Sequence, residues 1–284
     1  MSNNQAEKTQ TSKCQDEALE KQFLEEKKDE DLGVYCDLFS AKTTFEGQDG
    51  GVVSALLVKG FEEGLFDVAV IVRRGEGYSA KATVASSADE VLAAKGTRYL
   101  KVNVTKKLRE LISQGKIHIA VVCTPCEAKA VRKIQQTFKG ECEITIIGLF
   151  CFEAFNSARL KTETAVRLGI DLDKAQKTQI RHGKFSALVD GKEYSCKVKE
   201  LDEAAEKICS YCNDFTSQLA DVSVGSVGSR KGYSTVIVRS KVGEKLLKNF
   251  DAVKDAVDKE EIVRLSKFKC ERAKKSLALL KSHK

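Results

Sequence analysis

The central part of the chain alternates short apolar runs with segments whose apolar residues recur every three or four positions. FDVAVIVRR at 66–74, KIHIAVVCT at 116–124 and EITIIGLFC at 143–151 have the length and composition of buried strands. Helical spacing appears in five other segments, at 49–65, 87–96, 105–115, 126–138 and 152–169. Strands that alternate with helices predict βα units, so we expect an α/β (mixed α+β) fold with helices flanking a central, largely parallel sheet.

The pattern changes after residue 175. Residues 176–198 carry turn signals at Gly183 and at Asp190-Gly191, which predict a β-hairpin. A polar segment with a Cys-x-x-Cys pair follows at 203–215, and 219–240 reads as strand, glycine loop and strand. Residues 251–284 are charged, and we expect them to form a basic helical C-terminal extension.

Charge is spread unevenly along the 284 residues. The net charge is +7, yet residues 1–31 carry nine acids and five bases, and we expect a flexible acidic N-terminal tail with a short helix at 18–28. The last 21 residues hold eight Lys or Arg and one Glu, which fits a solvated helix face or attraction for anionic ligands or an acidic partner. No apolar run approaches the ~20 residues that span a bilayer, so we expect a cytoplasmic protein without a membrane span.

Ten cysteines raise the question of a metal site, because a reducing compartment disfavours disulfides. Cys126 and Cys151 each follow an apolar strand, and the carboxyl ends of parallel strands lie at one edge of a sheet. Cys209 and Cys212 lie on a polar turn that can fold over that edge. Four thiolates suit a 4Fe–4S cluster or a zinc ion, and a redox dithiol of Cys123 with Cys126 is a third possibility.

Three glycine-bearing segments are candidate anion sites. Gly50 and Gly51 precede a helix, whose free N–H groups attract phosphate. Gly96 stands beside Thr97, Arg98 and Tyr99 in AKGTRYL. The loop VGSVGSRKGYS at 224–234 precedes a strand rather than a helix, so it is not a Rossmann fingerprint, and a plain β-connection explains it equally well.

Together these pieces resemble the beta-subunit family of coenzyme F420-reducing hydrogenase, which includes the beta subunit of F420-dependent formate dehydrogenase. The matching stretches are DGGVVSALLVKGFEEGLFDVAVIV, AAKGTRYL, TPCEAKAVRKI, IGLFCFEAF, ICSYCNDFTSQLADVSVGSVGS and GYSTVIVRS. They run in family order from about residue 33 to 245. The resemblance implies an N-terminal domain at 32–117 and a C-terminal domain at 118–250 with the cofactor sites.

The resemblance also implies an oxidoreductase that binds FAD and one 4Fe–4S cluster and transfers a hydride between FAD and coenzyme F420. The implied cluster ligands are Cys126, Cys151, Cys209 and Cys212, with Cys123 as a spare buried thiol. The implied FAD contacts are Gly50, Gly51, Gly96, Thr97, Arg98, Tyr99, Gly225, Ser226, Gly228, Ser229 and Lys231. Because F420 carries a phosphate and an oligoglutamate tail, candidate contacts for it are Arg73, Arg74, Arg98, Arg181, Lys184, Arg230 and Lys231. No catalytic side chain is implied, and Glu153 and Asp214 are expected only to cap or hydrogen-bond near the cysteines.

With one cluster, the chain needs an electron partner in a hetero-oligomer: a hydrogenase, formate dehydrogenase or heterodisulfide reductase subunit. One alternative is a related FAD/iron–sulfur reductase that uses ferredoxin and another substrate. A second is a zinc-binding module with four cysteine ligands and a basic face. Nucleic acid is not expected, because the chain has no tryptophan and no repeated basic–aromatic motif.

Overall fold

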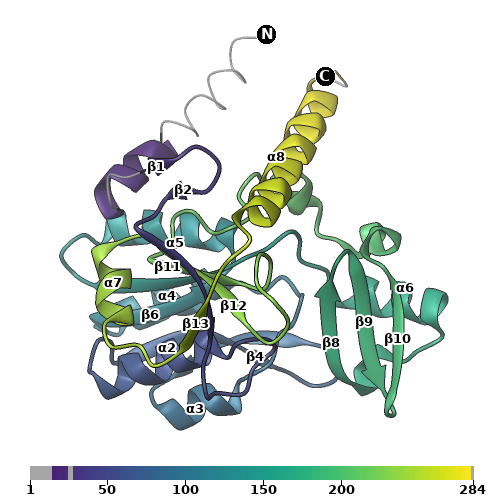
Figure 1. The fold of residues 1–284 in the computed structure, drawn as a ribbon, viewed down its shortest axis with the longest axis horizontal. Coiled ribbons are helices and arrows are strands. Elements are labelled where there is room, and N and C mark those ends of the chain that lie inside the picture. Colours follow the sequence, from purple (N-terminus) through teal and green to yellow (C-terminus); the bar gives the residue numbers. More distant parts are fainter. Residues whose placement is uncertain (1–14, 25–27, 283–284) are drawn as a thin grey trace.

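The computed structural model describes residues 15–24 and 28–282, and it forms one large sheet with helices on both faces and a smaller sheet beside it (Figure 1). The large sheet has eight strands in the order β13-β3-β12-β11-β7-β6-β4-β5. Its strands are β3 Asp37–Lys42, β4 Val68–Arg74, β5 Ala80–Ala85, β6 His118–Cys123, β7 Glu143–Leu149, β11 Val222–Gly225, β12 Ser234–Val238 and β13 Val253–Asp255. The pairs β4–β6, β6–β7 and β7–β11 are parallel, and the pairs toward either edge are antiparallel.

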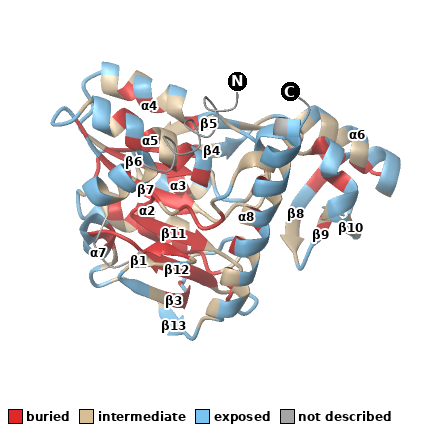
Figure 2. Ribbon diagram, turned by 90° about the horizontal axis from the view of Figure 1, so that it is seen from above, coloured by how far each residue is buried: buried red, intermediate tan, exposed pale blue. Residues whose placement is uncertain are grey.

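The helices cover the sheet as the apolar alternation requires. On β4, Ala69 and Ile71 pack with one group of helices, and Val68 and Val70 pack with the other. The first face is covered by α2 Val52–Glu62, α3 Ala88–Ala93 and α7 Lys241–Leu247; the second by α4 Val104–Ser113 and α5 Pro125–Thr137. Figure 2 shows burial concentrated in the strands between these layers. The predicted mixed α/β class with a central sheet and flanking helices is confirmed.

The predicted hairpin at 176–198 is one part of a three-stranded antiparallel sheet, because the segment before Gly183 pairs as a full strand. Its strands are β8 Ala175–Arg181, β9 Lys184–Val189 and β10 Lys192–Lys197. It packs with α6 Ser157–Leu168 and with 3-10 helices at Leu172–Lys174 and Val198–Ala204 around its own core, which contains Phe185 and Phe155. A third 3-10 helix, Lys207–Tyr211, carries Cys209.

The first and the last described segments both contact the main body. Residues 15–23 are helical, and Asp16 forms an ion pair with Lys129 of α5 at 2.7 Å. A short pair of strands, β1 Lys28–Asp29 and β2 Gly33–Val34, follows. The predicted flexible tail covers residues 1–31, of which 1–14 and 25–27 lie outside the described residues. The C-terminal helix α8, Lys259–Ser282, begins against the sheet and extends beyond it (Figure 1). No described helix is long and apolar enough to cross a membrane.

Candidate functional site

A cleft of about 300 Å³ lies at the carboxyl edge of the parallel strands. The last residues of β4, β6, β7 and β11 and the residues just after them contribute to it, among them Val72, Cys123, Phe150 and Gly225. This edge is where open α/β sheets bind ligands. The topology therefore selects the cleft as the candidate binding site.

One wall of the cleft is the start of α2. Gly51 adopts φ +71°, and a Cβ there would lie 2.0 Å from the carbonyl oxygen of Phe45, so only glycine fits this turn. No side chain caps the helix, and its first turn holds no acidic residue. The N–H groups of Val52, Val53 and Ser54, which line the cleft, therefore have no partner within the helix, and the helix dipole favours an anion there.

A second wall is the segment from Gly96 to Tyr99. Gly96, Thr97, Arg98 and Tyr99 all line the cleft. The Arg98 guanidinium lies 5.3 Å from the Tyr78 ring centroid, and burial lowers the pKa of Arg98. Its Nε is buried and has no hydrogen-bond partner among the described residues. A polar ligand in the cleft can supply such a partner.

Of the predicted FAD contacts, seven line the cleft: Gly51, Gly96, Thr97, Arg98, Tyr99, Gly225 and Ser226. Four do not. Gly50 lies behind Gly51, where its N–H donates to Ser234 Oγ at 3.1 Å. Gly228, Ser229 and Lys231 lie on the turn after β11, which runs toward α8; the Gly228 N–H donates to Glu261 Oε2 at 3.0 Å. The resemblance assigned this whole glycine-bearing segment to FAD, and the sequence does not show the direction of the turn.

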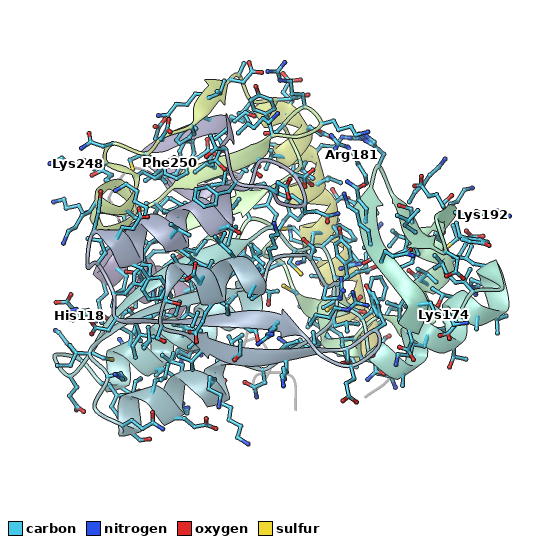
Figure 3. The ribbon with its side chains drawn as sticks, turned by 90° about the horizontal axis from the view of Figure 1, so that it is seen from below. His118, Lys174, Arg181, Lys192, Lys248 and Phe250 are labelled. Atoms are coloured by element: carbon cyan, nitrogen blue, oxygen red, sulfur yellow. The ribbon has the colours of Figure 1, made fainter. Side chains whose placement is uncertain are left out.

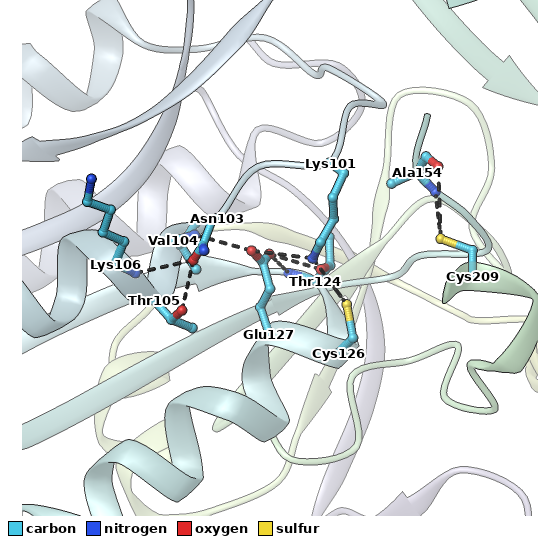
Figure 4. A network of polar contacts seen from close by, with 10 residues as sticks. All are labelled: Lys101, Asn103, Val104, Thr105, Lys106, Thr124, Cys126, Glu127, Ala154 and Cys209. Carbon is cyan, nitrogen blue, oxygen red and sulfur yellow. Dashed lines mark hydrogen bonds and ion pairs between the residues drawn. The ribbon is translucent and has the colours of Figure 1, made fainter. Parts of the chain in front are cut away.

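Cys126 lies at the first turn of α5, next to the cleft. The Lys101 ammonium donates to Cys126 Sγ at 3.4 Å and lies 3.6 Å from Glu127 Oε1 (Figure 4). The Glu127 carboxylate in turn accepts from the Val104 N–H and from the Thr124 N–H and hydroxyl. Burial opposes a charged Lys101, but Glu127 and Cys126 outweigh it and raise the pKa of Lys101. A fixed positive charge therefore stands beside the Cys126 sulfur.

The other three predicted ligands lie close enough to influence one another. Burial raises the pKa of Cys151 to about 12; the sulfurs of Cys209, Cys126 and Cys212 add to that shift, and Lys269 opposes it. Burial also raises the pKa of Cys209, while the Ala154 N–H, which donates to Cys209 Sγ at 3.4 Å, lowers it (Figure 4). Residues far apart in sequence thus bring four thiols to one region of the fold.

Within the described residues, no three His, Cys, Asp or Glu side chains form a compact group that could hold a metal ion. The four thiols are electrostatically coupled without meeting at one point. Four thiols in one region are a donor set that a 4Fe–4S cluster or a zinc ion could use. The donor set, four thiols beside two lysines, suits an anionic thiolate-bound group.

Cys123 differs from its neighbour Cys126. It ends β6, is 2% exposed, and burial raises its pKa well above the usual range of a thiol. A buried thiol that resists deprotonation is a poor nucleophile. Its placement agrees with a spare buried thiol, although it lines the cleft.

The predicted F420-binding cations divide into three groups. Arg74, Arg98 and Arg181 lie around the cleft and the small sheet: Arg74 donates to the Ala175 carbonyl at 3.4 Å, and Arg181 lies 3.6 Å from Asp49. Figure 3 shows Arg181 at the tip of β8. Arg230 forms an ion pair with Asp255 at 2.8 Å on the turn with Lys231, away from the cleft lining. Arg73 and Lys184 are exposed.

Sequence reasoning missed several residues of this region. Gln48, Asp49 and Ser54 flank the predicted glycines and line the cleft, which the Asp-Gly-Gly start of a helix could have indicated. Lys101 is one residue beyond the matching stretch AKGTRYL. Glu153 does more than cap, since it forms a buried ion pair with Arg272 of α8 at 2.8 Å. No local pattern signals that pair.

Comparison with known protein families gives two adjoining matches. Residues 38–109 match the N-terminal part of the coenzyme F420 hydrogenase/dehydrogenase beta subunit, and residues 117–264 match its C-terminal part. Residues on both sides of the gap between the matches contribute strands to the same large sheet.

Individual proteins similar to this chain point to the same family. The chain is 35% identical over 259 residues to the coenzyme F420-dependent sulfite reductase of Methanocaldococcus jannaschii, covering 86% of this chain but only 41% of that protein. It is 33% identical to the coenzyme F420 hydrogenase subunit beta of Methanococcus voltae, covering 83% of this chain and 92% of that protein. A chain of the F420-reducing [NiFe] hydrogenase complex from Methanosarcina barkeri superimposes with a TM-score of 0.85 at 28% identity, over 91% of this chain and 96% of that one. The protein belongs to the coenzyme F420 hydrogenase/dehydrogenase beta-subunit family.

Proposed function

We propose that this chain is the F420-dependent subunit of a redox complex. In this proposal FAD occupies the cleft, and Cys126, Cys151, Cys209 and Cys212 hold one 4Fe–4S cluster. Coenzyme F420 is the substrate, and a hydrogenase, formate dehydrogenase or heterodisulfide reductase subunit is the electron partner. When bound, FAD supplies the exchange between two-electron hydride chemistry and one-electron transfer, and the cluster carries single electrons.

The observation that carries this proposal is that the cleft and the cysteines share the same two loops. Thr124 lines the cleft, and Cys126 follows two residues later; Phe150 lines the cleft, and Cys151 is the next residue. A ligand in the cleft is therefore separated from the thiols by only these short segments. Such proximity is what electron exchange between two bound cofactors requires.

The residues that line the cleft suit a dinucleotide ligand. The uncapped start of α2 offers N–H donors to a diphosphate, as helix N-termini do in other phosphate sites. Arg98 and the hydroxyl groups of Thr97 and Ser226 offer further polar contacts. Apolar side chains from α2 and the strands, such as Leu57 and Ile71, line the remainder.

The cations near the mouth support an anionic substrate. Arg74, Arg98 and Arg181 come from different elements and approach the region between the cleft and the small sheet. They suit the phosphate and oligoglutamate of coenzyme F420. Their role in this chain is to bind and orient the substrate rather than to move protons.

Anaerobic purification tests the proposal directly. We expect bound flavin, iron and acid-labile sulfide, and a change in deazaflavin absorbance when F420 is supplied with an artificial electron donor or acceptor. Flavin and iron without F420 turnover would favour a reductase with another substrate. Zinc in place of iron would favour the zinc-binding module, and absence of both flavin and iron would refute the proposal.

A matched cysteine pair tests the ligand assignment. Cys126→Ser should lose most of the iron and the acceptor reduction, since it removes an exposed thiol beside Lys101. Cys123→Ser should keep both close to wild type, since that thiol ends β6 and packs within a buried hydrophobic cluster. Iron content per chain is the measurement, and equal losses in the two variants would contradict the assignment.

A further inference from the structure

The helix α8 contributes two cations to the cysteine region, although its sequence reads as a solvated basic helix. Lys269 is 1% exposed, and its ammonium donates to the carbonyl oxygens of Cys151 at 2.5 Å and Asp214 at 2.7 Å. Arg272 is partly buried one turn further along. The family match ends at residue 264, so both side chains lie beyond it.

The Lys269 ammonium has no carboxylate counter-ion at ion-pair distance within residues 15–24 and 28–282. The Asp214 carboxylate accepts from the Gln218 N–H instead, at 2.9 Å. A buried cation without an ion pair is costly, and the carboxylates of Asp214 and Glu153 interact with Lys269 only beyond ion-pair distance. Its hydrogen bond to the Cys151 carbonyl places its charge on the segment that carries the Cys151 thiol.

A second ammonium approaches the same thiols from another element. Lys101 donates to Cys126 Sγ at 3.4 Å and also interacts electrostatically with the Cys151 thiol. Lys101 already has Glu127 as a counter-ion at 3.6 Å, whereas Lys269 has only carbonyl oxygens. The two lysines therefore approach the thiols from different elements, and Lys269 is the one without an ion pair among the described residues.

Arg272 joins the two cysteine-bearing segments. Its Nη2 donates both to the Phe152 carbonyl at 2.9 Å, next to Cys151, and to the Cys209 carbonyl at 3.2 Å. Its Nη1 pairs with Glu153 at 2.8 Å, and the guanidinium lies 4.2 Å from the Phe152 ring centroid. One side chain thus holds the loop after β7 against the 3-10 helix that carries Cys209.

We propose that α8 is a structural part of the cysteine site. Lys269, together with Lys101, compensates the charge of an anionic thiolate-bound cluster and raises the reduction potential of that cluster. Arg272 fixes the distance between the two cysteine segments. The inference rests on the proposed function, since four thiolates outweigh the positive charge of an iron–sulfur core. Lys269, Lys101 and Arg272 are positioning and tuning residues rather than ligands.

The test is a reductive titration of the anaerobically purified protein, followed by electron paramagnetic resonance. Lys269→Met keeps the length of the side chain and removes its charge, so the midpoint potential should shift to more negative values because the reduced cluster loses a stabilising cation. Lys101→Met should shift it in the same direction, and the double variant should shift by about the sum. Lys269→Arg should restore a potential close to wild type.

The control is Lys275→Met, an exposed position on the same helix, where the potential should not change. A wild-type potential in Lys269→Met would overturn the tuning role. Loss of iron in both Lys269→Met and Lys269→Arg, with unchanged thermal unfolding, would also overturn it, since charge would then not be the relevant property. If Lys269→Met does not fold, the half-buried Lys101→Met decides, and an unshifted potential there refutes the proposal.

Arg272→Lys tests the second part. It keeps the charge but cannot reach both carbonyls and Glu153, so iron should be lost several-fold faster to a chelator while the potential of the remaining cluster stays near wild type. An unchanged loss rate would overturn the positioning role. If the wild-type protein itself binds no iron, the proposed function fails, and that result is distinct from all of these.

Discussion

At the scale of single residues, Cys123 and Cys126 lie three positions apart, yet one is buried and the other is exposed. Cys123 ends a buried strand, and Cys126 is exposed on the first turn of a helix beside Lys101. Pro125 between them occupies the first helical turn, where its missing N–H costs nothing. The turn therefore points one sulfur into the core and the other toward the cysteine region.

Gly225 is a residue-scale requirement of the same region. A Cβ at this position would lie 2.2 Å from the Phe150 ring and 2.6 Å from Phe150 Cβ, which is too close for a small side-chain shift to relieve. We expect Gly225→Ala to lower the free energy of unfolding by ~1–3 kcal/mol in urea denaturation, as overpacking does. Ser226→Ala is the matched control. The cost should shrink in a Phe150→Ala background, and an equal cost in both backgrounds would contradict the stated cause.

At the scale of elements, one buried ion pair fixes α5 against the sheet. Arg132 of α5 and Asp221 lie 2.9 Å apart with side chains 2% and 1% exposed. Asp221 also accepts from the Ile146 N–H of β7 and from the Ser240 hydroxyl at the start of α7. The Arg132 guanidinium further stacks 4.9 Å from the ring centroid of Phe23 in the N-terminal helix. This network sets the position of the helix that carries Cys126.

Arg132→Met should therefore be strongly destabilising, because it leaves the Asp221 carboxylate buried without its cation. We expect a loss of ~3–5 kcal/mol in the free energy of unfolding. Lys107→Met, which removes a half-exposed pair with Glu110, should cost no more than ~1 kcal/mol. Equilibrium denaturation measures both, and comparable losses would show that the buried pair has no special role.

The βα alternation was predictable because apolar periodicity is local, and α2, α4, α5, β4, β6 and β7 lie close to their predicted ranges. The order of the strands in the sheet could not be predicted, because β3 and β12 pair although nearly 200 residues separate them. The inward side of α8 was also unpredictable: Lys269 is buried only because carbonyl groups of Cys151 and Asp214 reach it. Of the candidate site, the four cysteines, Gly51 and the segment 96–99 were named from the sequence, but the turn that takes Gly228 away from the cleft could not be foreseen.

At the scale of the whole molecule, polar bridges join the small sheet to the main body at the mouth of the cleft. The Ile180 N–H of β8 donates to Tyr99 Oη at 2.9 Å, and the Gln48 side chain donates to the Thr178 carbonyl at 3.2 Å. Burial raises the pKa of Tyr99 to about 12, so its phenol stays neutral at physiological pH. Tyr99 thus serves both as a cleft wall and as a tether between the two sheets.

Tyr99→Phe separates these two roles, because it keeps the ring and removes only the acceptor for the Ile180 amide. A single neutral hydrogen bond contributes ~0.5–1.5 kcal/mol, so amide hydrogen exchange at Ile180 should become roughly 2- to 10-fold faster. Exchange at Val121 in the central β6 should keep its wild-type rate, since that strand pairs on both sides within the large sheet. Unchanged exchange at Ile180 would mean that the other bridges alone hold β8 against the cleft, whereas faster exchange at both positions would mean that the substitution destabilises the whole fold.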